Sequence, residues 1–266
     1  MPSGPFEGRS LHFIGIGGAG MSGLALVARS LGGTVTGSDR AESSYWEQLR
    51  AARIEPTLGH NAANLPAEAE VVVSTAIPDE NPELSAARAA GATILHRGDL
   101  LGELSRMKRT IAVGGTHGKT TTASMTALAL LECGREPAFL IGGELRAAGT
   151  NAAWGEGEWA VIEADESDRS FLKLERDVAV ITNVELDHHA TYPSVLALEA
   201  AFGEFAEPAG LRVLGPDLSA YAASGPTVSI GIDSGDLEAR DLSLHPGGSR
   251  FSVAGVQVEL RVPGRH

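Results

Sequence analysis

The chain has 266 residues, 43% of them hydrophobic, which is enough for two ordinary domains or one large one. Its formal net charge is −13 at pH 7 and it has no run of Lys or Arg, so we expect no nucleic-acid partner, because phosphate backbones need a basic surface. No stretch is long enough to span a membrane, and the single cysteine excludes an internal disulfide. These features predict a cytoplasmic protein without membrane insertion, with Cys133 buried at the end of an apolar helix.

A glycine-rich pattern, G-x-G-x-x-G, occupies residues 15–20, directly after a strand-like apolar run. An amphipathic helical stretch follows it, and Asp39 ends the next predicted strand, at 34–38. This combination predicts a βαβ nucleotide-binding unit. The simplest ligand is NAD with Asp39 on a ribose hydroxyl, but the same glycines fit any nucleoside diphosphate because they contact pyrophosphate.

Predicted strands and helices alternate through the first hundred residues, which predicts an α/β fold with a doubly wound parallel sheet. Helices are expected from Pro82 to Ala90 and from Arg97 to Ser105. Ser74 and Thr75 lie near the carboxyl end of a strand, where a turn role and a substrate contact are both open. Residues 107–109 are the expected hinge to a second domain.

A second glycine-rich segment, 114–122, stands between a short β-branched strand and a strong helix former. Strand, glycine turn, Lys-Thr and helix are the layout of a triphosphate-binding loop, with Lys119 as a point charge for the outer phosphates and a Thr hydroxyl for Mg²⁺. The strict pattern has Gly at position 113, where this chain has Val113.

Two acidic or histidine-bearing segments follow predicted strands of this second unit. The first holds four carboxylates within 163–168, which should repel one another and attract a cation such as Mg²⁺. The second contains His188 and His189, of which at most one should face the site. Residues 144–154 read as irregular, and the tail predicts a small antiparallel meander that covers one side of the domain, with a tight hairpin at Ala254-Gly255.

Taken together, these segments resemble the Mur ligases of peptidoglycan synthesis. The matching stretches are 12–21, 37–39, 115–121, 163–168 and 183–192. The resemblance is strongest to members that join L-alanine to UDP-N-acetylmuramate, although a related ligase that reattaches a recycled tripeptide to this sugar nucleotide shares most motifs. The loop of this family has the pattern G-T-x-G-K-T, which begins at Gly115 in this chain, so the resemblance does not require glycine at position 113. The resemblance implies a Rossmann-like UDP-sugar-binding domain at 1–107 and a P-loop-type α/β ATP-binding domain with a small antiparallel extension at 108–266.

The resemblance also implies roles for individual residues. Lys119 would steady the β- and γ-phosphates of ATP, Thr120 with Glu163 would hold one Mg²⁺, and His188 would hold a second metal; Lys119, Glu163 and His188 are the implied catalytic residues. ATP contacts are implied for Gly115, Thr116, His117, Gly118, Lys119, Thr120 and Thr121. UDP-sugar contacts are implied for Gly15, Gly17, Gly18, Ala19, Gly20, Met21, Ser38, Asp39, Ser74 and Thr75. The family often has Met-Asp after its histidine, where this chain has His189-Ala190.

The family continues into a third domain beyond the point that matches 263–266. By that comparison this chain is expected to be a truncated ligase that binds the sugar nucleotide and has little or no ligation activity, unless the third domain is supplied elsewhere. Two other readings stay open: a non-catalytic UDP-sugar-binding module, and a nicotinamide oxidoreductase that rests on the first glycine motif and Asp39.

Overall fold

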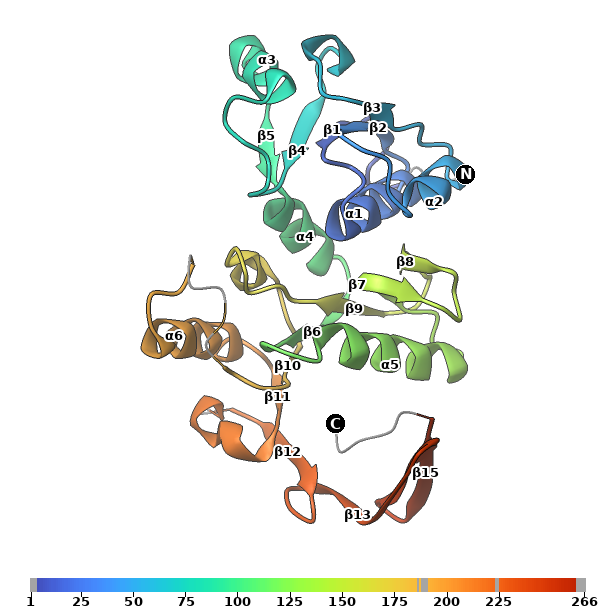
Figure 1. Cartoon of the computed structure of the whole chain (residues 1–266), viewed down its shortest axis with the longest axis vertical. Coiled ribbons are helices and arrows are strands. Elements are labelled where there is room, and N and C mark those ends of the chain that lie inside the picture. The colour runs from blue at the N-terminus through green and yellow to red at the C-terminus, as the bar shows by residue number, and fades with distance from the viewer. Residues whose placement is uncertain (1–3, 186, 188–190, 223–224, 262–266) are drawn as a thin grey trace.

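The computed structural model describes residues 4–185, 187, 191–222 and 225–261. Its elements form two sheets, the first in the upper part of Figure 1 and the second running from its middle to its lower end, with helices α1 and α4 between them. The first unit contains β1 (Ser10–Ile14), α1 (Ala19–Ser30), β2 (Thr34–Asp39), α2 (Trp46–Ala51), β3 (Thr57–Leu58), the 3₁₀ turn η1 (Ala62–Asn64), β4 (Glu70–Val73), α3 (Pro82–Ala90), β5 (Ile94–His96) and α4 (Arg97–Ser105). The strand order is β3-β2-β1-β4-β5, and every pairing is parallel, which confirms the predicted parallel α/β sheet.

The second unit contains β6 (Arg109–Gly114), α5 (Lys119–Glu132), β7 (Ala138–Leu145), β8 (Thr150–Ala153), β9 (Trp159–Glu163), the 3₁₀ turn η2 (Ser170–Lys173), β10 (Val178–Ile181), α6 (Val195–Ala206), β11 (Leu211–Leu214), the 3₁₀ turn η3 (Pro216–Tyr221), β12 (Thr227–Ile232), β13 (Leu237–His245), β14 (Gly248–Val253) and β15 (Val256–Leu260). Its order is β15-β14-β13-β12-β11-β10-β6-β9-β7-β8. In this register Val113 of β6 lies opposite Glu163 of β9, and Gly114 opposite Ile181 of β10. The loop after β6 is therefore flanked by the carboxyl ends of both neighbouring strands.

Local sequence accounts for the ends of α3 and the start of α4, two helices that the sequence predicts. The Asn81 side chain accepts hydrogen bonds from the N–H groups of Glu83 and Leu84, Pro82 occupies the first turn, and Gly91 ends α3 in the left-handed region. A capping box between His96 and Asp99 starts α4.

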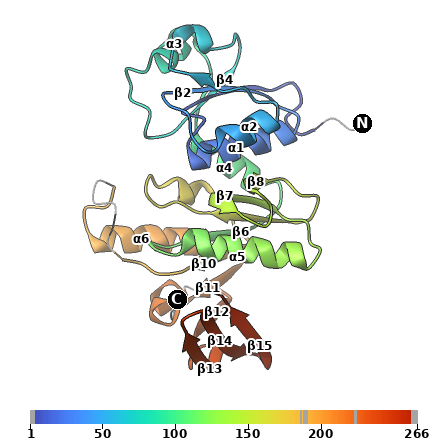
Figure 2. The same ribbon diagram turned by 45° about the vertical axis from the view of Figure 1, so that its right-hand side comes forward.

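One apolar core joins the two sheets. It includes Leu11 and Leu24 of the first unit together with Leu140 and Ile162 of the second, all at most 6% exposed. Helices α1 and α4 supply this contact: α1 packs on β7 and β8, and α4 packs on η2. The view in Figure 2 shows the same layering, with α1 and α4 above the central sheet and α5 on its other side. In the described part of the chain, no helix has both the length and the apolar content to cross a bilayer.

Three expectations differ from the structure. Of residues 144–154, read as irregular, 144–145 complete β7 and 150–153 form β8, because the antiparallel β7–β8 pair extends the edge of the sheet. The tail is antiparallel from β13 to β15, and its hairpin has positive φ at Ala254 and Gly255 as a tight turn requires, but it continues the sheet beyond β12 instead of covering a face (Figure 1). Cys133 is exposed, because α5 has already ended at Glu132.

Asn151 of β8 ties the second unit to α1. Its side chain is fully buried, and its amide nitrogen donates to the Ala19 carbonyl oxygen at 2.7 Å. Replacing Asn151 with alanine is expected to cost about 1–2 kcal/mol of folding free energy, because the Ala19 carbonyl would lose a buried partner. Urea unfolding measures this loss. Gln48→Ala is the matched control, since Gln48 donates to Gly149 in an exposed hydrogen bond and should change the unfolding free energy by less than about 0.5 kcal/mol; equal losses in both variants would contradict the role of Asn151.

Candidate functional site

The segment between β6 and α5 has a conformation that its glycines impose. Gly115 has φ of +133°, and a Cβ on it would lie 2.0 Å from Thr182 Oγ1, so no larger residue fits. Gly118 precedes the first residue of α5, again at positive φ. The result is a tight turn that ends at a helix N-terminus, where backbone N–H groups and the helix dipole favour a phosphate.

Residues after β10 hold this loop in place. Thr116 Oγ1 donates to the Glu185 carbonyl at 2.9 Å and accepts from the Glu185 N–H at 2.9 Å. The side chain of Asn183 accepts from the His117 N–H at 2.8 Å and donates to the His117 carbonyl at 2.9 Å. The backbone of His117 is thus fixed, while its imidazole is 63% exposed. The sequence predicts no role for Asn183, although Asn183 follows a strand and begins the stretch 183–192 that resembles the family.

Lys119 lies at the mouth of the loop. Its ammonium donates to the carbonyl oxygens of Gly115 and Thr116, at 2.8 and 3.2 Å, and to Glu166 Oε1 at 3.0 Å. The Glu166 side chain is only 1% exposed, and this burial raises its pKa although the Lys119 ammonium opposes the change. Lys119 therefore places a positive charge beside the glycine loop, and the buried carboxylate of Glu166 pairs with it.

Thr120 and Glu163 place two oxygen atoms side by side next to Lys119. Thr120 Oγ1 donates to Glu163 Oε1 at 3.0 Å, and the Gly142 N–H donates to Glu163 Oε2 at 2.7 Å. A hydroxyl and a carboxylate at the end of a phosphate loop fit Mg²⁺, which prefers oxygen ligands and completes its shell with phosphate and water. No cluster of three or more His, Cys, Asp and Glu suited to an ion occurs within the described residues. His188 lies outside them.

The four carboxylates at 163–168, which the sequence predicts to attract a cation, have different partners in the structure. Arg97 pairs with Asp165 at 2.7 Å and with Asp168 at 2.8 Å, and Glu166 pairs with Lys119. Burial alone would raise the pKa of Asp165, but the Ser167 N–H and the Arg97 guanidinium lower it. The partners of Glu163 are neutral: the Thr120 hydroxyl and the Gly142 N–H. Arg97 and Lys119 therefore supply positive charge to the other three acids, and Glu163 stays the predicted Mg²⁺ ligand of the four.

The residues predicted to bind a UDP-sugar gather at the carboxyl ends of β1, β2 and β4. The Gly17 N–H donates to Asp39 Oδ2 at 2.8 Å, so Asp39 already contacts the glycine loop. Gly15 forms the bend after β1, Gly18 caps α1, and Ala19 and Gly20 begin that helix. Ser74 is half-buried and Thr75 exposed just after β4.

Two of these predicted side chains are turned into the first unit. Met21 is 4% exposed and belongs to the core. Ser38 is fully buried, and its hydroxyl donates to Glu83, a buried carboxylate that the sequence did not single out. Because both side chains are buried, a ligand could contact either residue only through its backbone atoms. Of the residues predicted to contact ATP, Thr121 is exposed on the first turn of α5.

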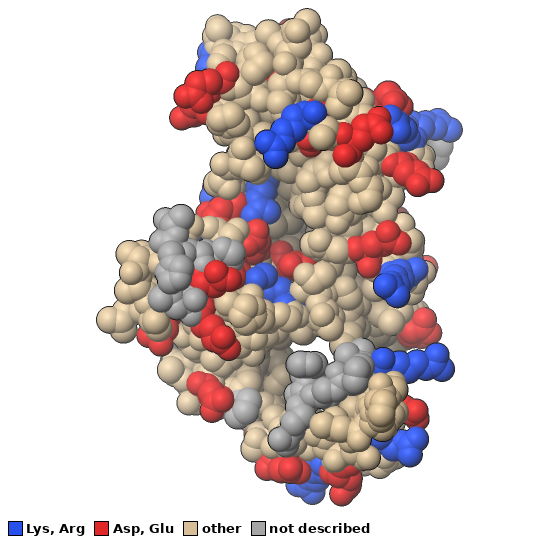
Figure 3. Space-filling view, viewed as in Figure 1, with Lys and Arg blue, Asp and Glu red and all other residues tan. Residues whose placement is uncertain are grey.

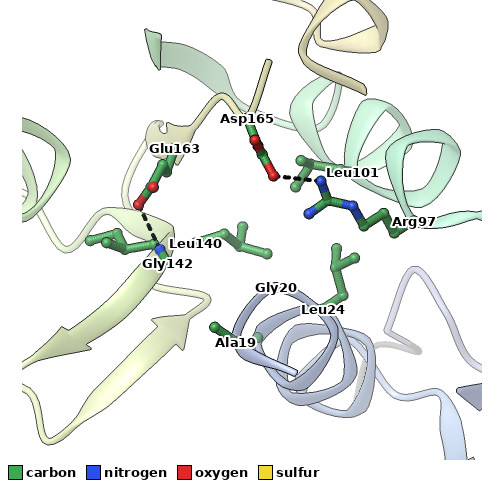
Figure 4. Close-up of a pocket in the computed structure, with 11 residues that line it drawn as sticks. Ala19, Gly20, Leu24, Arg97, Leu101, Leu140, Gly142, Glu163 and Asp165 are labelled. Atoms are coloured by element: carbon green, nitrogen blue, oxygen red, sulfur yellow. Dashed lines mark hydrogen bonds and ion pairs between the residues drawn. The ribbon is translucent and has the colours of Figure 1, made fainter. Parts of the chain in front are cut away.

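A cavity of about 170 Å³ lies between α1, α4 and the ends of β7 and β9. It extends from Ala19 and Gly20 at the start of α1 to Gly142 and Glu163, and Arg97 and Asp165 border it (Figure 4). Figure 3 shows acidic and basic side chains gathered in a hollow of this face of the molecule. Sequence reasoning missed Arg97, because its partners in the chain lie 68 and 71 residues away.

Comparison with known families assigns both halves of the chain. Residues 10–109 match the Mur ligase family, catalytic domain, and residues 113–266 match the Mur ligase middle domain. A UDP-N-acetylmuramate–L-alanine ligase of Streptomyces coelicolor is 46% identical over 272 residues, which cover 96% of this chain and 59% of that protein. The enzyme of the same name from Allorhizobium ampelinum is 54% identical over 198 residues, 74% of this chain and 42% of the relative. The chain spans about half the length of these curated relatives.

Solved structures give the same fold. A UDP-N-acetylmuramate-alanine ligase from Thermotoga maritima superposes with a TM-score of 0.87 at 30% identity, covering 96% of this chain and 61% of that one. A UDP-N-acetylmuramate:L-alanyl-gamma-D-glutamyl-meso-diaminopimelate ligase from Neisseria meningitides gives a TM-score of 0.85 at 28% identity, covering 97% and 89%.

Proposed function

The chain belongs to the Mur ligase family, and on this basis we propose that it supplies the sugar-nucleotide and ATP sites of a cytoplasmic ligase that joins L-alanine to the lactyl carboxylate of UDP-N-acetylmuramate. In this proposal residues 1–107 bind the UDP-sugar and residues 108–266 bind ATP. The observation that supports it most directly is a cavity that reaches from Ala19 and Gly20, at the end of the first glycine loop, to Glu163, which accepts a hydrogen bond from Thr120 just after the second.

The reaction brings together two anions, a triphosphate and a carboxylate. The γ-phosphoryl group passes to a carboxylate oxygen of the sugar nucleotide, the bond to ADP breaks, and an acyl phosphate forms. The amine of L-alanine then attacks the carbonyl carbon, phosphate leaves, and the nitrogen loses a proton. Lys119 lowers the repulsion, because its ammonium can exchange two loop carbonyls for phosphate oxygens.

Mg²⁺, when bound, would neutralise charge on the phosphate oxygens. Thr120 and Glu163 are the described residues that fit it. The family resemblance adds His188 as a ligand of a second metal, and this remains a prediction outside the described residues.

A second candidate is ligation of a peptide to the same sugar nucleotide. It is favoured by the tripeptide ligase of Neisseria meningitides, whose structure is nearly as similar as the alanine ligase structure. Competition between L-alanine and the tripeptide for amide formation would separate the two.

Calorimetry tests the proposal. We expect saturable binding of UDP-N-acetylmuramate and, independently, of a non-hydrolysable ATP analogue with Mg²⁺, each at a stoichiometry of one. Saturable binding of NADH in place of the sugar nucleotide would overturn the proposal in favour of an oxidoreductase, and binding of the sugar nucleotide without any nucleotide triphosphate site would favour a non-catalytic module.

Glu163→Gln is expected to weaken the Mg²⁺-dependent binding of the ATP analogue at least about tenfold, because a neutral amide replaces the carboxylate that fits the metal. Binding of the analogue without Mg²⁺ should change little. Titration of Mg²⁺ against a fixed nucleotide concentration measures the difference. Glu158→Gln is the matched control, since Glu158 lies just before the same strand with its side chain 60% exposed. An unchanged Mg²⁺ requirement in Glu163→Gln would rule out the assigned role.

A further inference from the structure

The carboxylate of Glu83, on the first turn of α3, is fully buried and binds two separate segments of the first unit. Its Oε2 accepts a hydrogen bond from the Ser38 hydroxyl, and His12 Nε2 lies 3.3 Å from the same oxygen. Its Oε1 accepts from the Asn61 N–H at 3.0 Å and from Asn64 Nδ2 at 2.6 Å. This carboxylate has no part in the proposed reaction.

The two segments that Glu83 binds meet at Asp39. Ser38 precedes Asp39 directly, near the end of β2. On the other side, Asn64 Nδ2 donates to the Gly59 carbonyl at 3.0 Å, and the Gly59 N–H donates to the Asp39 carbonyl at 2.7 Å. The end of β2 is therefore fixed both through the Ser38 hydroxyl and through the residues that follow β3.

The end of β2 in turn holds three successive N–H groups of the first glycine loop. The Ser38 carbonyl accepts from the Gly15 N–H at 2.8 Å and from the Ile16 N–H at 3.0 Å. The Asp39 carboxylate accepts from the Gly17 N–H at 2.8 Å. Because α1 begins just after this loop, the position of the loop sets where the N–H groups of the first helical turn point.

Fold stability alone does not require a buried carboxylate at this place. Replacing buried ionic groups with apolar side chains of similar volume is often neutral for stability. An ionised acceptor, however, binds its donors more strongly than a neutral one, and a fully satisfied buried network holds one conformation. The hydrogen bonds that lower the pKa of Glu83 to about 2 keep it ionised at neutral pH.

We propose that Glu83 is a positioning residue for binding of the sugar nucleotide: acting through Ser38, it holds the first glycine loop in its binding conformation before the ligand arrives. This inference rests on the proposed function, in which that loop binds the UDP-sugar. A preformed loop loses little conformational freedom on binding, so its loosening raises the Kd of a ligand that uses it. The triphosphate loop belongs to the other sheet and keeps its own contacts.

Calorimetry tests the inference, with UDP and with a non-hydrolysable ATP analogue plus Mg²⁺, at a temperature where circular dichroism shows each variant to be folded. Glu83→Gln is expected to weaken binding of UDP about fivefold or more, because an amide has one acceptor oxygen in place of two. Binding of the ATP analogue should stay within about twofold. Leu84→Ala is the matched control: Leu84 is the next residue of α3 and is buried in an apolar cluster, so its truncation should destabilise the fold but change UDP binding less than about twofold.

Ser38→Ala tests the route by which Glu83 acts. It removes the buried hydroxyl that joins the carboxylate to β2, and it is expected to weaken UDP binding to a similar extent. The double variant Glu83→Gln with Ser38→Ala should lose no more than about twofold beyond the weaker-binding single variant, because both changes break one connection. Losses that multiply in the double variant would overturn the inference. Should Glu83→Gln not fold, Ser38→Ala alone decides: selective loss of UDP binding supports the inference, and unchanged binding overturns it.

The remaining outcomes are separable. Unchanged UDP affinity in Glu83→Gln would overturn the inference, and so would a loss that Leu84→Ala shares or that extends to the ATP analogue, since either indicates a general loosening of the protein. If the unaltered protein does not bind UDP, the proposed function fails and the inference fails with it.

Discussion

Lys119→Ala is expected to reduce ligation about 10²–10³-fold, roughly 3–4 kcal/mol of transition-state stabilisation, if the chain acts as proposed. The Lys119 ammonium donates hydrogen bonds to the carbonyl oxygens of Gly115 and Thr116 in the glycine loop, and alanine cannot supply this positive charge. Steady-state phosphate release in the presence of ATP, UDP-N-acetylmuramate and L-alanine measures kcat, and calorimetry with an ATP analogue measures the part of the loss that arises on binding. Lys173→Ala, on the exposed surface of η2, controls for the loss of a positive charge.

A double variant separates two causes of this loss. Lys119→Ala also deprives buried Glu166 of its ion pair, and a carboxylate in that position could distort the loop by itself. The double variant Lys119→Ala with Glu166→Gln removes the unpaired buried carboxylate but does not restore the ammonium. We expect the double variant to stay as inactive as the single one. Recovery of turnover in the double variant would show that Lys119 acts only by balancing Glu166.

Glu83→Gln is expected to destabilise the protein by about 3 kcal/mol at pH 7. The side chain is fully buried on α3, and burial alone would raise its pKa, but hydrogen bonds from His12, Ser38, Asn64 and the Asn61 N–H lower that pKa to about 2. A neutral amide cannot accept these bonds with the same strength. Denaturant unfolding at pH 7 measures the difference in unfolding free energy.

The same group gives a pH dependence with a definite sign. Because the folded pKa lies below the unfolded value of 4.5, the stabilisation by Glu83 is complete above pH 4.5 and is lost as pH falls toward 2. The difference between Glu83→Gln and the unaltered protein should therefore shrink by about 2 kcal/mol between pH 7 and pH 3. Glu80→Gln, exposed three residues earlier, should show no such trend. A difference that stays constant with pH would mean that Glu83 is not held ionised.

Features with local causes were the ones that the sequence could predict. Asn81, Pro82 and Gly91 fix the ends of α3 within ten residues of chain, and the two glycine loops follow from short motifs. The prediction of a parallel sheet followed by a second α/β unit is confirmed for the same reason, since strand and helix periodicities are local.

Features that depend on contacts between distant parts of the chain could not be predicted from the sequence. The acids at 163–168 are predicted to repel one another, but the positive partner of Asp165 and Asp168 is Arg97, on a helix of the other unit. Residues 150–153 have little β-propensity, and they form a strand because β7 and α1 offer partners. Glu83 is similar: a glutamate in the first turn of a helix usually faces water, and only the fold brings His12 and Ser38 to it.

The shared core beneath α1 also has a consequence for substrate choice. Since α1 follows one glycine loop and packs directly on β7 and β8, next to the strand that ends in Glu163, the spacing between the two glycine loops is set by close-packed side chains rather than by a linker. A rigid spacing selects substrates by length. On the proposed function, a sugar nucleotide reacts only when the distance from its diphosphate to its carboxylate matches the distance between the two loops. Analogues with a longer or shorter spacer would then be rejected even if every chemical group matched.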